Sequence, residues 1–399
     1  MKYRLIFLIA SPFQDRDEKR FGINLIASLG IDVEVWEISY LADPADVIWV
    51  DIPTSDDKAY LKRLNNDDEV FFCLSKLDSR DRVISMLGHG SRNIGIYKQL
   101  RKQNISFGQS ILGLTPADID RTSNWLRRLT ELYYSPSLLL TYVAKHLKTK
   151  IRKGGASTPQ PDFMVVGGAH WNRTKYYSTL TTPEIVHVHS YDYESFRQEK
   201  EGESAALISH IPYLVYLDQN FGSVVKAYRG RPLCNTNTYY DDLNRFFSLV
   251  EDKIGMEVVI AAHPKWNVKN QSHPFGGRSI IQNKTANLVG NSAGVLANYS
   301  TSIHLAVLYR KPLTFLDSKD YSYFVRSNTK LFAKELDATL INIQKRGDTD
   351  IVNLSRVTED KYREFVQKYI KEQSSPDGSL WGVVCDYLDQ RRNNFKTTA

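Results

Sequence analysis

The chain has 399 residues, a length that suggests about two domains of roughly 150–200 residues each. Apolar residues make up 42% and charged residues 24%, a balance that excludes a disordered or fibrous chain. The 52 basic residues outnumber the 45 acidic ones, for a net charge of +7, which favours anionic ligands such as nucleotides and phosphates. No long basic run is interleaved with aromatic residues, so we expect no nucleic-acid partner.

Targeting and redox signals are weak. No stretch approaches the roughly 20 apolar residues of a membrane helix. The three cysteines (Cys73, Cys234 and Cys385) lie far apart and predict neither a disulfide framework nor a metal site. We therefore expect a cytoplasmic protein, whose positive charge would allow peripheral contact with the inner face of the membrane.

Residues 1–205 are predicted to form a first Rossmann-like domain. It opens with a strand over 3–10, a polar loop over 11–20, a helix over 21–29 and a strand over 31–38. Further strands are expected to end at Val50, Leu74, Gly168 and His189, with a helical region over 118–150 and an exposed loop over 150–161.

A charged, apolar-poor segment over 197–204 is typical of a linker, and residues 206–399 are predicted to form a second Rossmann-like domain. Its strands are expected to end at Leu217, Ala262, Tyr299 and Leu316, its helices to span 241–254, 285–292 and 302–310, and its last helices to lie within 356–392. The predicted fold class is α/β. Such folds bind ligands beyond the carboxyl ends of the strands, in the cleft between the domains.

Two polar clusters follow predicted strands of the second domain. His263-Pro264-Lys265 follows one strand, and Ser300-Thr301-Ser302 follows another and precedes a helix. Hydroxyl groups and free backbone N–H groups at the start of a helix suit a phosphate, and imidazole and ammonium groups can add donors. The alternative for each cluster alone is an ordinary helix cap or loop histidine.

The stretches EVVIAAHPK and TANLVGNSAGVLANYSTSIHLAVLYRKPLTFL resemble the C-terminal domain of bacterial GT-B glycosyltransferases, over about residues 239–317. The resemblance is to enzymes that use CMP-activated sugars, such as sialyltransferases and Kdo transferases. It implies the GT-B fold and a nucleotide phosphate held by His263-Pro264 and by Ser300-Thr301 with Ser302. It also implies transfer of a nonulosonic acid or Kdo to a capsule, lipopolysaccharide or lipid-linked saccharide acceptor. The segment around His89 lacks the GxGxxG pattern, so no nicotinamide or flavin cofactor is expected. Metal dependence is not implied, because positive side chains and a helix N-terminus can stabilise the leaving phosphate.

One position departs from that family. Related enzymes often carry a glutamate that binds the ribose, where this chain has Leu305, next to His304. CDP-glycerol-type transferases share a similar motif pattern, so a CDP-polyol phosphotransferase is an alternative. A non-catalytic nucleotide- or glycan-binding protein of the same fold is another.

Sugar transfer needs a carboxylate, either as a base for the acceptor hydroxyl or as a nucleophile. Asp17 lies in the first loop beside two arginines, and Asp192 follows the strand that ends at His189. Asp17 is favoured, because the first loop of such a domain is expected to face the cleft. Asp218-Gln219-Asn220 is predicted to contact the donor. His187 and His189 have no third ligand at metal spacing, so no metal site is expected.

Overall fold

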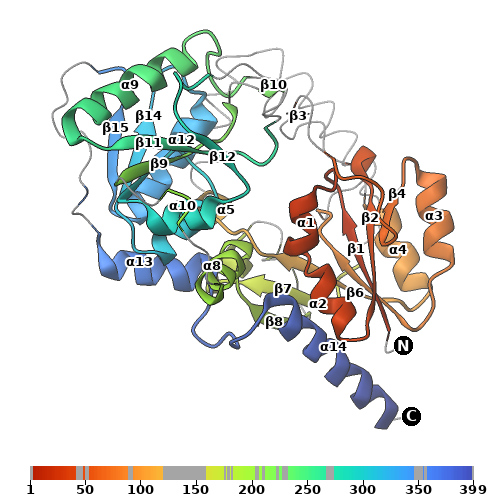
Figure 1. Ribbon diagram of the computed structural model, residues 1–399. Helices are drawn as coiled ribbons and strands as arrows, with labels where there is room; N and C mark the ends of the chain where they lie inside the picture. The colour runs from red at the N-terminus through yellow and green to blue at the C-terminus, as the bar shows by residue number, and fades with distance from the viewer. Residues whose placement is uncertain are drawn as a thin grey trace.

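Two parallel sheets organise the chain (Figure 1), one of seven strands in the order β4-β2-β1-β5-β6-β7-β8 and one of six in the order β12-β11-β9-β13-β14-β15. A computed structural model describes residues 3–41, 48–49, 54–88, 93–119, 159–174, 177, 180, 183–202, 206–208, 212–221, 224–226, 232–266, 274–345, 354 and 357–397. The predicted helical region over 118–150 lies outside these residues except for its first two positions.

Every neighbouring pair in the two sheets is parallel, as expected for Rossmann-like domains. The first sheet contains β1 (Arg4–Ile9), β2 (Asp32–Glu37), β4 (Leu61–Arg63), β5 (Asp81–Ser85), β6 (Ser106–Ile111), β7 (Phe163–Gly167) and β8 (Glu184–Val188). The second contains β9 (Tyr213–Leu217), β11 (Glu257–Ala262), β12 (Ile280–Gln282), β13 (Gly294–Ala297), β14 (Leu313–Asp317) and β15 (Thr339–Asn342). A short antiparallel pair joins β3 (Ile48–Trp49) to β10 (Val224–Lys226).

Helices alternate with these strands. In chain order they are α1 (Asp15–Arg20), α2 (Ile23–Ser28), α3 (Asp67–Ser75), α4 (Ile94–Lys102), α5 (Pro116–Ile119), α8 (Tyr191–Glu201), α9 (Tyr239–Ile254), α10 (Thr285–Asn291), α11 (Ile303–Leu308), α12 (Tyr323–Glu335), α13 (Glu359–Phe365) and α14 (Leu380–Thr397). Among the described residues, none of the helices is long and apolar enough to cross a membrane.

The predicted strand over 3–10 is confirmed as β1, and its side chains point alternately to the two faces of the sheet. In β1, Leu5 and Phe7 enter one apolar cluster, whereas Ile6 and Leu8 enter another on the opposite face of the sheet. All four side chains are fully buried. A strand that is covered on both faces must be apolar at every position, and this is the continuous apolar run seen in the sequence.

The predicted strand ending at Leu74 is wrong, because this segment forms α3. Asn66 caps the helix by accepting a hydrogen bond from the backbone N–H of Glu69 at 2.9 Å. Val70 and Leu74, four residues apart, are buried, whereas the intervening Phe72 is 64% exposed. The apolar run therefore has helical periodicity with one face in solvent.

Two other segments differ from the predictions. The loop expected over 11–20 contains α1, and the linker expected over 197–204 begins as the second half of α8. Short helices with few apolar residues carry little periodic signal, so they were missed in the sequence.

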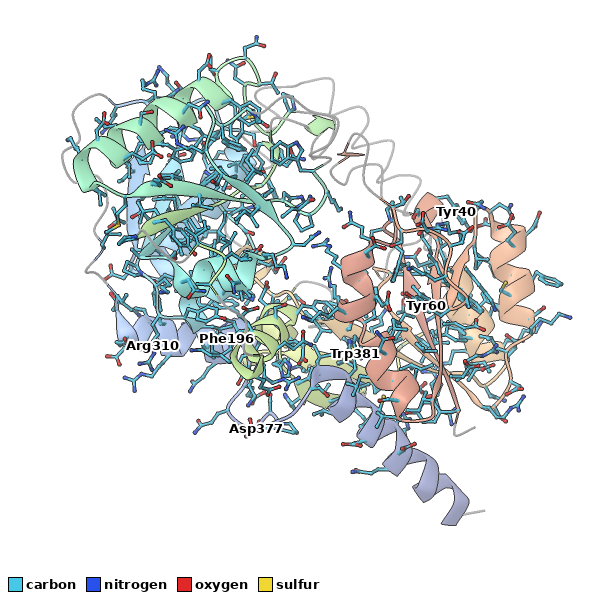
Figure 2. All side chains as sticks on the ribbon, viewed as in Figure 1. Tyr40, Tyr60, Phe196, Arg310, Asp377 and Trp381 are labelled. Atoms are coloured by element: carbon cyan, nitrogen blue, oxygen red, sulfur yellow. The ribbon has the colours of Figure 1, made fainter. Side chains whose placement is uncertain are left out.

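The last helix, α14, packs on the first sheet although residues 206–399 were assigned to the second domain. The indole N–H of Trp381 donates to the carbonyl of Arg20 at 2.7 Å, and its ring meets Phe7 at 4.8 Å between centroids. Figure 2 shows Trp381 in this position, between α14 and the first domain. The buried stripe of α14 completes the apolar cluster beneath β1.

Glu194 in α8 fastens the start of α14. Its carboxylate accepts hydrogen bonds from the backbone N–H of Leu380 at 3.0 Å and from the guanidinium of Arg197 at 2.6 Å, and it lies 2.7 Å from the ring of His189. Burial acts to raise the pKa of Glu194, but the hydrogen bonds from His189 and Arg197 outweigh it and hold the pKa at about 2.

We expect Glu194→Gln to destabilise the protein by about 3 kcal/mol, because buried partners lose their charge complement. The folded-state pKa lies below the ordinary value, so this stabilisation is complete above about pH 4.5 and is lost as the pH falls toward 2. Urea unfolding at pH 7 and pH 3 measures it. An equal loss at both pH values would contradict the role of the charge.

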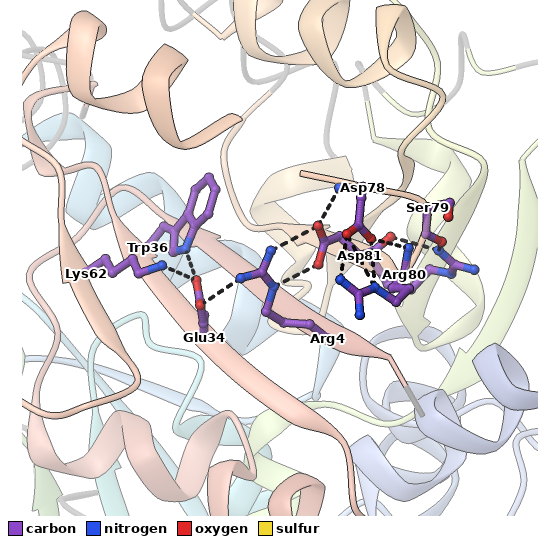
Figure 3. A network of polar contacts seen from close by, with 9 residues as sticks. Arg4, Glu34, Trp36, Lys62, Asp78, Ser79, Arg80 and Asp81 are labelled. Atoms are coloured by element: carbon purple, nitrogen blue, oxygen red, sulfur yellow. Dashed lines mark hydrogen bonds and ion pairs between the residues drawn. The ribbon is translucent and has the colours of Figure 1, made fainter. Parts of the chain in front are cut away.

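A polar network crosses the first sheet at the amino end of β1 (Figure 3). Arg4 donates to Asp81 at 2.8 and 3.0 Å and to Glu34 at 3.1 Å. Glu34 also accepts from Lys62 and from the indole of Trp36. The network joins four adjacent strands at the sheet edge opposite the carboxyl end of β1, and so we assign it a structural role.

Candidate functional site

The two polar clusters lie at neighbouring strand ends of the second sheet. Strand β9 pairs with β11 on one side and with β13 on the other. Because the strands are parallel, the segments that follow them leave the sheet at the same edge. Neighbouring strands are about 4.8 Å apart, which places the starts of His263-Pro264-Lys265 and Ser300-Thr301-Ser302 roughly 10 Å from one another across Asp218.

The His263-Pro264-Lys265 segment is held as a tight turn. The side-chain amide of Gln282 donates to the carbonyls of His263, Pro264 and Trp266 at 3.0, 3.1 and 2.7 Å. One amide group at the end of β12 therefore gathers three carbonyls. With these oxygens drawn toward β12, the turn keeps a fixed shape.

The ring of His263 has a defined tautomer. Its Nδ1 accepts a hydrogen bond from the backbone N–H of Lys265 at 3.1 Å, so the proton of the neutral ring is on Nε2. Burial, together with the positive charges of Arg16 and Lys265, lowers the pKa of His263 to about 3. At neutral pH this histidine is therefore an uncharged N–H donor.

The Asp218 segment is more buried than a donor contact requires. The carboxylate of Asp218 accepts the backbone N–H of Asn220 at 2.9 Å, and it also accepts backbone hydrogen bonds from His263 and Gln219. Burial raises its pKa to about 6 despite these bonds. Asp218 is 4% exposed and Asn220 2% exposed, so their side chains fix the backbone of the strand ends, whereas Gln219 between them is partly exposed. The contact of this segment with a donor stays a prediction.

The hydroxyl cluster lies beside a loop of the first domain. The Ser300 hydroxyl accepts the backbone N–H of Ser302 at 3.1 Å and is largely buried, whereas Thr301 is exposed. A Cβ atom placed on Gly113, in the loop after β6, would lie 3.6 Å from the methyl group of Thr301. The cluster therefore faces the junction between the two domains.

Helix α1 reaches the same junction from the other side. The side-chain amide of Gln14 donates to the carbonyl of Pro264 at 3.4 Å, and its oxygen accepts from Arg16 at 3.0 Å. The charge of Arg16 influences both His263 and Asp192. Gln14 and Arg16 thus bring first-domain groups to the His263-Pro264-Lys265 cluster of the second domain.

Asp17, favoured in the sequence, has a structural task. Its carboxylate accepts the backbone N–H of Gln14 at 3.0 Å in a capping box, and it lies 3.9 Å from the guanidinium groups of both Arg16 and Arg20. It is 5% exposed. The carboxylate of Asp17 therefore caps the N-terminus of α1.

Asp192 has the properties of a base. It lies in the first turn of α8 with 19% of its side chain exposed, and its Oδ2 is 3.5 Å from Nδ1 of His304. Burial raises the pKa of Asp192 to about 7, while the positive charges of Arg20 and Arg16 act in the opposite direction. A carboxyl group with a pKa near neutrality can both take and return a proton.

Leu305 and His304 are both buried in α11, at 2% and 0% exposure. Neither side chain is exposed to contact a ribose in place of the missing glutamate. Within the described part of the chain, no group of three or more His, Cys, Asp or Glu side chains is arranged to hold a metal ion.

No family model matches the sequence, and no curated protein matches it either. Among solved structures, the chain is similar to CalG4, the calicheamicin glycosyltransferase, with a TM-score of 0.52 and 10% identity over 98% of this chain and 99% of that one. It is also similar to the glycotransferase of kitacinnamycin, with a TM-score of 0.51 and 9% identity over the same shares. At these identities the likeness shows the fold alone. The chain has the GT-B fold, which confirms the predicted two Rossmann-like domains.

Three contributors to the junction were missed in the sequence. They are the amide of Gln14, the amide of Gln282 and the carbonyl of Leu114, which accepts from His304 at 3.1 Å. Gln282 is the last residue of β12, and a polar side chain at the end of a strand is a signal that could have identified it as a candidate site residue. A backbone carbonyl has no sequence signal, and the role of Gln14 depends on how the two domains meet.

Proposed function

We propose that the chain is a glycosyltransferase that takes a nucleotide sugar, with a CMP-activated donor as its specific substrate class. The observation that carries the proposal is the order β11-β9-β13, which brings His263-Pro264-Lys265 and Ser300-Thr301-Ser302 to one sheet edge. In GT-B folds the strand ends of the second domain are where a ligand is expected.

The donor phosphate would bind between the two clusters. Lys265 supplies a positive charge, the Nε2–H of His263 supplies a neutral donor, and the hydroxyl of Thr301 supplies another. Arg16 brings a second positive charge from the first domain. These groups stabilise the negative charge that develops on the leaving phosphate when the bond to the sugar breaks.

Asp192 would act as the base for the acceptor. It removes the proton of the attacking hydroxyl as the oxygen bonds to the anomeric carbon and the phosphate oxygen leaves with the electron pair. The positive charge of Arg16 acts on both Asp192 and His263, which supports a base close to the donor cluster. We propose a nonulosonic acid or Kdo as the sugar, and a surface polysaccharide or glycolipid as acceptor, on the resemblance of the motifs.

Ligand-induced stabilisation tests the donor class. We expect CMP to raise the melting temperature more than UDP, CDP or GDP at equal concentration, because binding to the native state stabilises it. Release of CMP from CMP-sugars, followed by chromatography, then tests turnover. A preference for uridine or guanosine would overturn the CMP assignment, and phosphorus in the acceptor product would indicate a polyol phosphotransferase instead.

We also propose peripheral contact with an anionic membrane, which rests on the net charge of +7. The protein is expected to sediment with anionic liposomes at low salt and to stay in solution with neutral ones. Failure to sediment with anionic liposomes at physiological salt counts against a role for the membrane.

A further inference from the structure

His304 occupies the contact between three segments. It lies in α11 of the second domain, its Nε2 is 3.1 Å from the carbonyl oxygen of Leu114 in the first domain, and its Nδ1 faces Asp192 of α8. Its ring packs edge-on against Phe365, with 5.7 Å between centroids. The ring is fully buried, so both nitrogen atoms must find their partners within the protein.

The carbonyl of Leu114 determines where the ring carries its proton. A carbonyl oxygen only accepts hydrogen bonds, so Nε2 must be the donor. In the neutral ring Nδ1 is then a lone-pair acceptor, and it has no hydrogen-bond partner among the described residues. Asp192 Oδ2 lies 3.5 Å from it. Two acceptors that face one another in a buried site favour the state with one proton between them.

We propose that Asp192 and His304 form one proton-holding pair, in which Nδ1 of His304 accepts a hydrogen bond from the carboxyl group that Asp192 becomes when it takes a proton from the acceptor. This inference deepens the proposed function and rests on it. Asp192 is the catalytic base, and His304 is a positioning residue that acts through Asp192.

The proton and electrons balance in this step. The acceptor O–H bond breaks and its proton goes to Asp192, the acceptor oxygen bonds to the anomeric carbon, and the bond from that carbon to phosphate breaks. Rotation about the Cβ–Cγ bond of Asp192 turns the new O–H group toward Nδ1, since this torsion has a broad, two-fold profile. The proton is then released to water, and the carboxylate is restored.

Charged groups and burial act on the protonation of both Asp192 and His304. Burial raises the pKa of Asp192, and the positive charges of Arg20 and Arg16 of α1 lower it. The lone pair on Nδ1 of His304, 3.5 Å from Oδ2, is an acceptor for the protonated carboxyl group. Burial keeps His304 neutral by lowering its pKa to about 4, while the hydrogen bond to Leu114 acts against this. The opposed influences leave Asp192 poised to change protonation state near neutral pH.

The variant His304→Gln tests the roles of the two ring nitrogens separately. Glutamine can keep the donor to Leu114 and lacks the acceptor at Nδ1, so we expect the pKa of Asp192 to fall by about one pH unit. The measurement is a ¹³C NMR titration of the aspartate carboxyl groups, with Asp192→Asn used to assign the resonance. The acid limb of the kcat/KM profile should move by the same amount, with the KM for the donor unchanged.

His189→Gln is the matched control, because His189 is also buried and pairs with a different carboxylate, that of Glu194. It should leave the Asp192 resonance in place. Melting curves show that each variant is folded. If His304→Gln does not fold, the ¹⁵N shift of Nδ1 in the wild-type ring, compared with Asp192→Asn, carries the same test.

An unchanged Asp192 titration in folded His304→Gln overturns the pair. So does a wild-type Nδ1 resonance that is protonated across neutral pH. The titration needs no sugar donor, so its result is independent of the proposed function. Lack of turnover with every CMP-sugar, with the titration as expected, would overturn the glycosyltransferase assignment and leave the proton-holding pair standing.

Discussion

His263→Ala is expected to weaken CMP binding by about 30-fold, as measured by isothermal titration calorimetry. The physical reason is the loss of a donor to a charged phosphate, which is worth about 2 kcal/mol. Since Nδ1 of His263 also receives the backbone N–H of Lys265, the substitution loosens the turn that presents the lysine.

His170→Ala is the matched control, because His170 lies in a short helical turn of the first domain after β7. It should leave the dissociation constant within two-fold of that of the wild type, a change of about 0.4 kcal/mol. His263→Asn should recover part of the affinity, because its amide can still accept from the Lys265 N–H. An unchanged dissociation constant in His263→Ala would remove the imidazole from the phosphate site.

Asp192→Asn is expected to lower kcat by about 10²- to 10⁴-fold and to leave CMP affinity unchanged, because an amide cannot accept the acceptor's proton. In the wild type, the carboxylate is the active form. With a pKa of about 7, kcat/KM should fall about ten-fold for each pH unit below that value and level off above it. Initial rates of CMP release between pH 5 and 9 measure this profile.

Asp17→Asn separates the two candidate carboxylates. The capping box of α1 would lose its charged acceptor, so we expect a loss of about 1–2 kcal/mol in stability with kcat preserved within a few-fold. The reverse pattern, in which Asp17→Asn abolishes turnover and Asp192→Asn does not, would assign the base to α1.

The centre of the second domain was predicted from sequence, whereas β12, β15 and α12 were not, and α14 packs on the first sheet. Strands β9, β11, β13 and β14 and helices α9, α10 and α11 lie where the apolar runs and cap residues place them. These segments are buried on both faces or carry a clear helical stripe, and their periodicity is local. The first domain was harder, because β5 and β6 contain Asp81, Arg82 and Gln109 within the sheet, which breaks the apolar run.

The candidate site divides in the same way. The positions of the His263-Pro264-Lys265 and Ser300-Thr301-Ser302 clusters at strand ends followed from the sequence. The choice between Asp17 and Asp192 did not, because it depends on which carboxylate is already bonded to its neighbours. Asp17 accepts a backbone N–H in a capping box, whereas Asp192 faces a histidine lone pair.

The sequence by itself determined β1, β2, the central strands of the second sheet, the fold class and the two polar motifs, since apolar periodicity and local turn residues are properties of contiguous segments. Only the tertiary structure decided that α14 returns to the first sheet, that His263 is neutral, and that His304 bridges Leu114 and Asp192. Burial and the pairing of polar groups distant in the chain set these features. Neither is encoded within a single segment.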